Sequence, residues 1–181
     1  MEHHKKIEKE LKKNGINFKG ISNTWPGNCF GCSPRNQRGL HLKIKLIDKK
    51  AVSYTILSED FCGFDKIAHG GIIATLLDEI SAWTVLSNLS SQGVTLNAHI
   101  KFHKPVLLGM LIKVEGEIEK FEGKRVIVRS SVQSIDGTIF AEGKTQFVIP
   151  GIKTLAQLVG EDESTLKGMF EIFNNSIQEN T

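Results

Sequence analysis

The sequence predicts an α+β fold in which one curved antiparallel sheet wraps around a single long helix. Three observations lead to this prediction. The stretch from about 70 to 88 is apolar on nearly every side, so a helix there must be covered on most sides. Two segments that alternate apolar and polar residues precede it and four follow it, which is typical of half-buried strands. Turn signals rather than long crossovers join these segments, so the sheet is not of the parallel kind.

The first predicted element is a short charged helix over residues 4–13. It carries Ile7 and Leu11 at helical spacing and stops at Asn14-Gly15, a pair that commonly ends helices. An arm that frays in solution is the alternative. A loop rich in proline, glycine and asparagine then runs from 25 to 39.

A hairpin of two strands precedes the long helix. Apolar residues alternate with polar ones on both sides of a turn at 48–50, as in a half-buried hairpin. The apolar positions are Leu40, Leu42, Ile44 and Leu46 in the first strand and Val52, Tyr54 and Ile56 in the second.

Four meandering strands follow the long helix. The first, from 93 to 104, has one strongly polar face and ends before Pro105. At a sheet edge this strand would pair with the same strand of a second copy, because an unpaired edge is a liability. The other three strands are marked by Ile112, Val114, Ile118, Val126, Val128, Val132, Ile139, Ala141 and Phe147, with turns at Glu122-Gly123 and Asp136-Gly137.

The chain ends in a predicted helical appendage. After Pro150-Gly151, apolar residues recur at the spacing of a helix stripe, at Leu166, Met169, Phe170, Phe173 and Ile177. We therefore divide the chain into an N-terminal helical arm and loop (1–27), one central domain (28–150) and a C-terminal appendage (151–181).

The composition is that of an ordinary globular chain. Its 181 residues suffice for one domain with a sizeable core, and 40% of them are hydrophobic. The net charge of +3 is compatible with phosphate-bearing small molecules and too weak to indicate nucleic acid. No apolar run approaches the roughly 18 residues that cross a bilayer, and the first residues lack the apolar core of a secretory signal. We expect a cytoplasmic protein that does not engage a membrane.

The three cysteines do not suggest a disulfide framework. Cys29 and Cys32 are the only pair that is close in sequence. A structural zinc site needs four ligands, and the sequence offers no second pair, with His41 as a third ligand only by chance. We therefore expect the pair to lie in a tight turn, reduced and without metal.

The most informative stretch is the start of the long helix, where His69-Gly70-Gly71 precedes an apolar run interrupted by Asp78. Burying an ionised carboxylate without a partner is costly, so Asp78 indicates a polar cavity against the helix. A helix start has unpaired N–H groups, and glycines let a ligand oxygen reach them, as an oxyanion hole requires. Glu79, about 100° further round the helix, is expected in a salt bridge or an interface.

The spacing of Gly70 and Asp78 predicts an assembly. Eight residues separate them, which places the N–H and the carboxylate about 12 Å apart along one helix. A carbonyl held by the N–H and attacked by a water or a carboxylate spans only roughly 6–7 Å. Antiparallel helices across a twofold axis would bring the two groups together from different subunits. We expect a homodimer, with further pairing into a homotetramer as the alternative.

The motif from His69 to Asp78, the segment Gly93-Val94-Thr95 and the run Phe102-His103-Lys104-Pro105-Val106 resemble the hotdog-fold acyl-CoA thioesterases. This is the 4-hydroxybenzoyl-CoA thioesterase superfamily, and the resemblance is to its phenylacetate-degradation and thioesterase-superfamily-member-4 types. It covers about residues 28–149, including the loop that begins at Cys29. The fold that it implies is the same: a curved antiparallel sheet around one long helix.

The resemblance implies hydrolysis of an acyl-coenzyme A to the free acid and coenzyme A. The Gly70 N–H would then hold the thioester carbonyl with support from His69, Asp78 would be general base or nucleophile, and Thr95 would hold the water or the acid. Gly71 would bind the coenzyme A part of the substrate. The basic hairpin residues Lys120, Lys124 and Arg125 would hold its phosphates, unless they only keep the turn soluble. Coenzyme A is part of the substrate, and no cofactor is expected.

The sequence departs from this family at Phe61-Cys62-Gly63, where several relatives have Asn or Gln. The missing polar contact affects the expected rate and not the reaction type. Two alternatives stay open. A non-catalytic acyl-CoA-binding protein would need no acid at Asp78, and a hotdog dehydratase or hydratase would need a histidine and a carboxylate placed for proton transfer at carbon. The sequence does not identify the acyl group.

Overall fold

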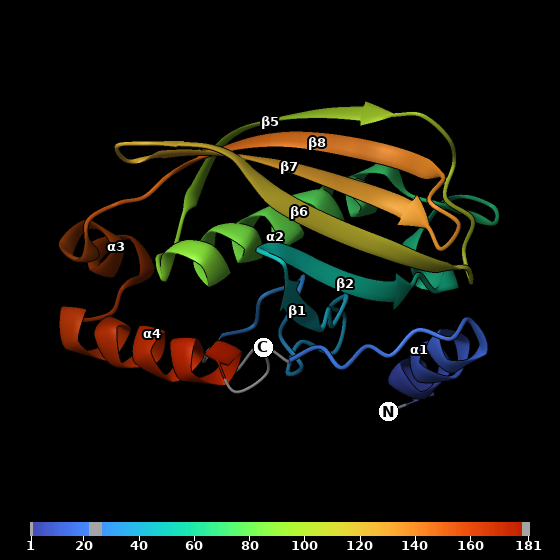
Figure 1. Ribbon diagram of the computed structural model, residues 1–181, viewed down its shortest axis with the longest axis horizontal. Coiled ribbons are helices and arrows are strands. Elements are labelled where there is room, and N and C mark those ends of the chain that lie inside the picture. The colour runs from blue at the N-terminus through green and yellow to red at the C-terminus, as the bar shows by residue number, and fades with distance from the viewer. Residues whose placement is uncertain (1, 22–26, 179–181) are drawn as a thin grey trace.

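The computed structural model describes residues 2–21 and 27–178 and has the predicted fold class. Its main sheet is antiparallel with the strand order β1-β2-β6-β7-β8-β5, and the long helix α2 (Gly70–Leu89) lies against it (Figure 1). The strands are β1 (Ile44–Ile47), β2 (Lys50–Ile56), β5 (Val94–Phe102), β6 (Leu111–Glu122), β7 (Arg125–Ser134) and β8 (Ile139–Val148). The polar-faced strand β5 is at an edge of this sheet, which is the condition under which pairing with a second copy was expected.

α2 is held at both ends by its own sequence. The His69 side chain caps the first turn, and Ser90 ends the helix in the left-handed conformation with a φ of 50°. Between these caps the helix packs on β2, β6, β7 and β8. Its fully buried side chains include Leu76, Leu77 and Ile80, so the core of the domain lies between α2 and the sheet.

One sequence-based statement needs correction. By length and mean hydropathy α2 could cross a membrane, although no apolar run was expected to be long enough. Asp78 and Glu79 interrupt the run but do not lower its mean hydropathy sufficiently. Half of the 18-residue stretch of α2 that has this hydropathy is buried inside the structure. A core helix of a folded domain has the same composition.

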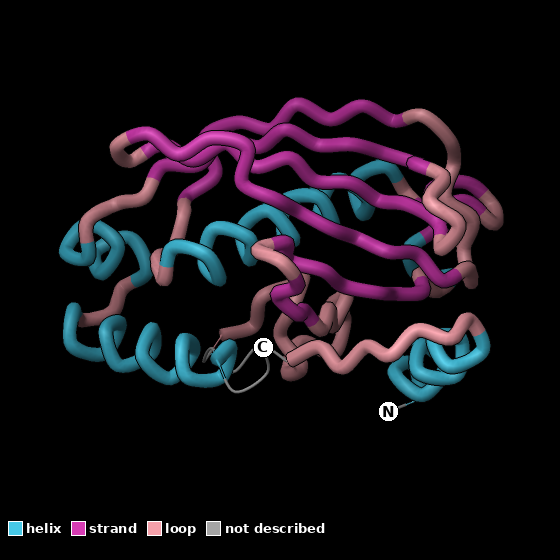
Figure 2. The backbone as a smooth tube through the Cα atoms, viewed as in Figure 1, coloured by secondary structure: helices cyan, strands magenta, loops and turns pink. Residues whose placement is uncertain are grey.

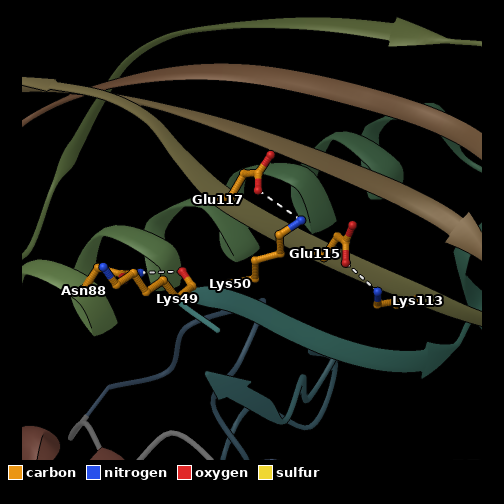
Figure 3. A network of polar contacts seen from close by, with 6 residues as sticks. All are labelled: Lys49, Lys50, Asn88, Lys113, Glu115 and Glu117. Atoms are coloured by element: carbon orange, nitrogen blue, oxygen red, sulfur yellow. Dashed lines mark hydrogen bonds and ion pairs between the residues drawn. The ribbon is translucent and has the colours of Figure 1, made fainter. Parts of the chain in front are cut away.

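Tight turns and surface ion pairs set the strand register. Asp48 and Lys49 both have positive φ, which suits the two-residue turn between β1 and β2. Across β2 and β6, Lys50 and Glu117 form an ion pair of 3.0 Å (Figure 3). Asn88 donates to the Lys49 carbonyl at 3.0 Å, so the end of α2 is tied to the first turn.

The first strand is shorter than predicted. His41 has a φ of 51°, which breaks an extended strand. The N–H groups of Leu40 and Leu42 donate to the carbonyls of Phe30 and Gly31 instead of pairing with β2. Both leucines are nevertheless buried. The alternation of apolar and polar residues therefore predicted their burial correctly but not the segment to which their backbone bonds.

A small second sheet between the first hairpin and α2 was not predicted. After the 3₁₀ turn η1 (Glu59–Phe61), β3 (Cys62–Phe64) pairs with β4 (Ile67–Ala68). These strands are too short to show a period of two in the sequence. They lead the chain into the cap at His69.

The terminal segments form helices on the same side of the sheet as α2 (Figure 2). α1 (Glu2–Lys13) buries Ile7 and Leu11 against Ile56 and Leu111, so the helix and not the frayed arm is confirmed. The C-terminal appendage contains α3 (Ile152–Val159), which was not predicted, and α4 (Glu163–Gln178). α4 buries Leu166 and Phe173 of the expected stripe; the side chain of Ile177 lies outside the described residues.

Because α2 packs closely on β6, we expect alanine substitutions at two glycines to change the stability of the protein in opposite directions. A methyl group at Gly116 would lie 2.5 Å from Thr84 Oγ1 and 3.3 Å from the Ile80 carbonyl oxygen. Gly116→Ala should therefore destabilise the protein by about 1–3 kcal/mol. Gly168 lies in α4 with open space around its Cα, and Gly168→Ala should stabilise by about 0.5–1 kcal/mol. Urea unfolding of both variants tests this, and equal effects would contradict the packing.

Candidate active site

Asp78 is a half-buried carboxylate that one hydroxyl group positions. Thr95 Oγ1 donates to Asp78 Oδ1 at 3.0 Å. Thr95 stands at the start of β5, where the register against β8 shifts between Thr95 and Asn97; such bulges re-aim side chains. Among the described residues no lysine or arginine forms an ion pair with Asp78. The sequence-predicted partner Thr95 is thus in contact, and Asp78 keeps a free oxygen.

The first turn of α2 offers one free donor at its exposed end. His69 Nδ1 accepts the Gly71 N–H at 2.9 Å, and the N–H groups of Ile72 and Ile73 donate to the His69 carbonyl. For the Gly70 N–H, no acceptor is found within the part of the chain that the structure describes. Gly70 is exposed, so this N–H can reach a ligand oxygen.

His69 and Gly71, expected to support the thioester carbonyl and to bind coenzyme A, contact each other in this structure. The His69 ring is engaged as a helix cap, and its backbone N–H donates to the Phe61 carbonyl at 2.8 Å. The Gly71 N–H is already used by that ring. A methyl group at Gly71 would lie 3.0 Å from His69 Nδ1, so Gly71 serves the cap, and a contact of its N–H with coenzyme A would require this bond to open.

A cavity of about 300 Å³ lies beside the Gly70 end of α2. Its apolar walls come from the helix and from the segment after β5, and they include Ile73, Phe102, Pro105 and Val106. The volume is at the lower end of those that hold small ligands. A larger cavity of about 640 Å³ opens between α1 and the β3–β4 hairpin. It contains neither Gly70 nor Asp78. Gly70 lines the smaller cavity, although Asp78 does not, and we assign the acyl end of the site to that cavity.

Gly70 and Asp78 do not meet within one chain. Gly70 and Asp78 are both in α2, which places them about 12 Å apart along its axis. The basic residues are also remote from Gly70. Val126, next to Arg125, packs with Val85 near the other end of the helix. Lys120, Lys124 and Arg125 lie at the β6–β7 turn, where Lys120 pairs with Glu122 at 3.0 Å.

The edge strand β5 is exposed along nearly its whole length. Val94, Leu96 and Phe102 are 37%, 48% and 56% exposed. β8 is its pairing partner in the described sheet, so its other edge has unpaired backbone groups. An exposed edge with large apolar side chains is a surface that folded proteins usually cover.

Glu79 has a different environment from the one expected. No ion pair of Glu79 occurs in the described residues; its carboxylate instead accepts from Trp83 Nε1 at 3.1 Å and contacts the Cys29 thiol. Burial raises the pKa of Glu79 to about 7. The expected salt bridge is therefore wrong, and the alternative, an interface, stays a prediction. The contact with Cys29 has no local signal, because that residue is 50 residues away in the sequence, whereas Trp83 is only four residues further along the helix.

Comparisons with known proteins place part of this chain near one family. Residues 65–141 match the family model described as the thioesterase superfamily. Over 103 residues the chain is 29% identical to the acyl-coenzyme A thioesterase THEM4 of Mus musculus, covering 56% of this chain and 44% of that protein. The chain spans about half the length of the curated relatives it matches.

Solved structures of the thioesterase superfamily share the fold. The crystal structure of protein RHA08564 has a TM-score of 0.61 with 19% identity and covers 80% of this chain and 81% of that chain. A hypothetical thioesterase of Streptococcus pneumoniae TIGR4, solved with coenzyme A, has a TM-score of 0.57 and 25% identity. That match covers 61% of this chain and 86% of the streptococcal chain.

Proposed function

Since residues 65–141 match the family model of the thioesterase superfamily and the chain shares the fold of solved proteins of that superfamily, we propose that this protein hydrolyses acyl-coenzyme A thioesters, with Asp78 and Gly70 as the principal catalytic groups. The observation that carries the proposal is the pairing of Asp78 with Thr95 at 3.0 Å. Partial burial of a carboxylate among apolar side chains costs free energy unless a hydrogen-bond donor compensates for the lost water. The curated relatives named acyl-coenzyme A thioesterases support the substrate class.

The proposed reaction needs a base and an oxyanion donor. Asp78 takes a proton from a water as that water attacks the thioester carbonyl, and the Gly70 N–H stabilises the negative oxygen that forms. The tetrahedral intermediate then expels the thiolate of coenzyme A, which recovers a proton. Direct attack by Asp78, followed by hydrolysis of the anhydride, is the second route with the same residues.

The proposed site lies between two subunits. One thioester carbonyl cannot contact two groups about 12 Å apart on one helix, so Gly70 of one copy would act with Asp78 of the other. Two antiparallel helices and two paired β5 edges would form a homodimer with two equivalent sites. The exposed apolar side chains along β5 support this assembly.

The acyl group would enter the cavity beside Gly70, whose apolar walls suit a hydrocarbon chain. The phosphates of coenzyme A would then meet the basic turn between β6 and β7. In the proposed dimer this turn belongs to the subunit that supplies Asp78. The streptococcal structure with coenzyme A shows that this fold can hold that group.

We expect Asp78→Asn to lower kcat at least about a hundredfold with KM little changed, because positioned bases are worth about 10² to 10⁴ in rate. The amide keeps the size of the side chain and the bond from Thr95. Thr95→Ala should be milder, because a hydroxyl that only orients a group contributes about 1–2 kcal/mol. Steady-state hydrolysis over a panel of short, long and aromatic acyl-CoAs provides the measurement.

Near-normal turnover by Asp78→Asn on the best substrate would remove Asp78 from the chemistry. If the wild-type protein binds acyl-CoA and hydrolyses none, the non-catalytic binding alternative replaces the enzymatic one. Circular dichroism of both variants controls for folding.

Gly70→Pro should remove the oxyanion donor without unfolding the helix. Gly70 is the first residue of α2, a position that favours proline. The preceding His69 has φ −63° and ψ 135°, as a residue before proline requires. We expect kcat to fall about 10²- to 10³-fold. Gly70→Ala is the matched control, since its methyl group would come no closer than 3.8 Å to Phe102 and the N–H stays.

Mixing the two inactive variants tests whether the site is shared. In a random mixture of Asp78→Asn and Gly70→Pro subunits, half of the dimers are mixed and each mixed dimer has one intact site. Activity should therefore return to about a quarter of the wild-type level. No recovery after verified subunit exchange would place Gly70 and Asp78 in one subunit's site and overturn the shared one.

Neutralising Lys120, Lys124 and Arg125 together should raise KM for acyl-CoA more than it lowers kcat, because phosphate contacts are alike in the ground and transition states. Lys153→Gln, on α3, provides a control for loss of charge elsewhere. The contrary pattern, a fall in kcat at unchanged KM, would exclude the basic turn from the phosphate site.

A further inference from the structure

The loop before the first hairpin folds back on the face of α2 away from β5. There two thiols of the loop meet one carboxylate of the helix. The ligand atoms of Cys29, Cys32 and Glu79 all lie within 4.8 Å of one another. Cys29 Sγ is 3.4 Å from Glu79 Oε2 and 3.6 Å from Oε1.

The loop is shaped closely around the carboxylate. Gly31, between the two cysteines, lies so near Glu79 that a methyl group would be 2.5 Å from the carboxyl carbon. Backbone bonds hold the loop that carries the two thiols independently of any ligand. The Ser33 N–H donates to the Cys29 carbonyl at 3.1 Å, and the Leu42 N–H donates to the Gly31 carbonyl at 3.0 Å. The three groups are thus held together before anything binds.

The charge of Glu79 lacks a cation. Its carboxylate contacts the thiols of Cys29 and Cys32 and the indole N–H of Trp83. Among residues 2–21 and 27–178 no lysine or arginine forms an ion pair with it. A carboxylate taken out of water without an opposite charge is unfavourable. A bound divalent cation would supply that charge.

The donor set and its spacing suit zinc. Zn²⁺ binds thiolate at about 2.3 Å and carboxylate oxygen at about 2.1 Å, so a tetrahedral site places sulfur and oxygen roughly 3.6 Å apart. The two distances from Cys29 to Glu79 are 3.4 and 3.6 Å. Two sulfur ligands also favour Zn²⁺ over the hard cations Mg²⁺ and Ca²⁺.

We propose that Cys29, Cys32 and Glu79 form a Zn²⁺-binding site whose fourth ligand is a water in the adjoining cavity of about 240 Å³, lined also by Trp83 and Leu86. Binding displaces the thiol protons, so two thiolates and one carboxylate face the dication. The metal would join the loop to α2 one residue beyond Asp78. The sequence predicted a metal-free pair because it offers no further ligand close to Cys29 and Cys32. Glu79 comes near them only in the folded chain.

Cobalt provides the first test, because Co²⁺ occupies zinc sites and its thiolate complexes absorb in the near-ultraviolet and visible. Reduced protein stripped with a chelator should bind one Co²⁺ per chain at micromolar concentration, with thiolate-to-cobalt bands that Zn²⁺ abolishes. Excess Zn²⁺ should also raise the Tm. Absence of these bands, or of bound Zn²⁺ by competition with a chromophoric chelator, would overturn the proposal.

Variants identify the ligands. Cys29→Ser and Glu79→Gln should each weaken Zn²⁺ binding at least about tenfold, since even outer partners of a metal site are worth about 10- to 100-fold. Cys62→Ser is the matched control: Cys62 is the remaining free cysteine, exposed in β3, and should leave the affinity unchanged.

Folding does not confound this comparison, because the apo forms of all variants are checked by circular dichroism and Glu79→Gln keeps the size of the side chain. Equal affinity in Glu79→Gln and wild type would overturn the site, as would a loss of binding confined to Cys62→Ser. A Cys29–Cys32 disulfide that persists in untreated protein and leaves no metal bound would do the same.

Discussion

The packing of α2 on the sheet includes two glycines of the strands beneath it. A methyl group at Gly116 would lie 2.5 Å from Thr84 Oγ1, and one at Gly143 would lie 3.4 Å from the Cβ of Leu77. Without side chains at these points, the helix can settle on β6 and β8 and bury Leu77 completely. This apolar contact fixes the rotation of the helix about its axis. The directions in which its polar residues leave the helix follow from that rotation.

Two consecutive acidic residues consequently face different surroundings. Neighbouring residues of a helix point about 100° apart, so Asp78 meets β5 while Glu79 meets the loop from 27 to 33. Each carboxylate has neutral hydrogen-bond donors, the hydroxyl of Thr95 for one and the indole of Trp83 for the other. A single helix thereby positions Asp78 for the proposed hydrolysis and Glu79 for the proposed metal site. The two carboxylates share no hydrogen-bond partner among these contacts.

The sequence predicted those elements whose signals are local. The long helix was expected over about 70–88 and is observed over Gly70–Leu89. Its limits are local in sequence, because His69 caps the first turn and Ser90 ends the last turn in the left-handed conformation. Features that depend on distant partners were missed. β1 begins at Ile44 because Leu40 and Leu42 bond to the Cys29 loop, and the contact of Glu79 with Cys29 crosses 50 residues. Thr95 was placed at Asp78 by resemblance, and the structure confirms their contact.

The helix that holds Gly70 and Asp78 also keeps them apart. Both the proposed oxyanion donor and the proposed base are held in place, since one is backbone in the first turn and the other is tied to β5 through Thr95. Bending α2 to bring them together would break the packing on Gly116 and Gly143. In the proposed dimer a second copy would remove the conflict, because its antiparallel helix would supply the missing group without any change in the first. In the proposed enzyme, then, the rigidity that makes each group precise is also the reason that the site must be shared between subunits.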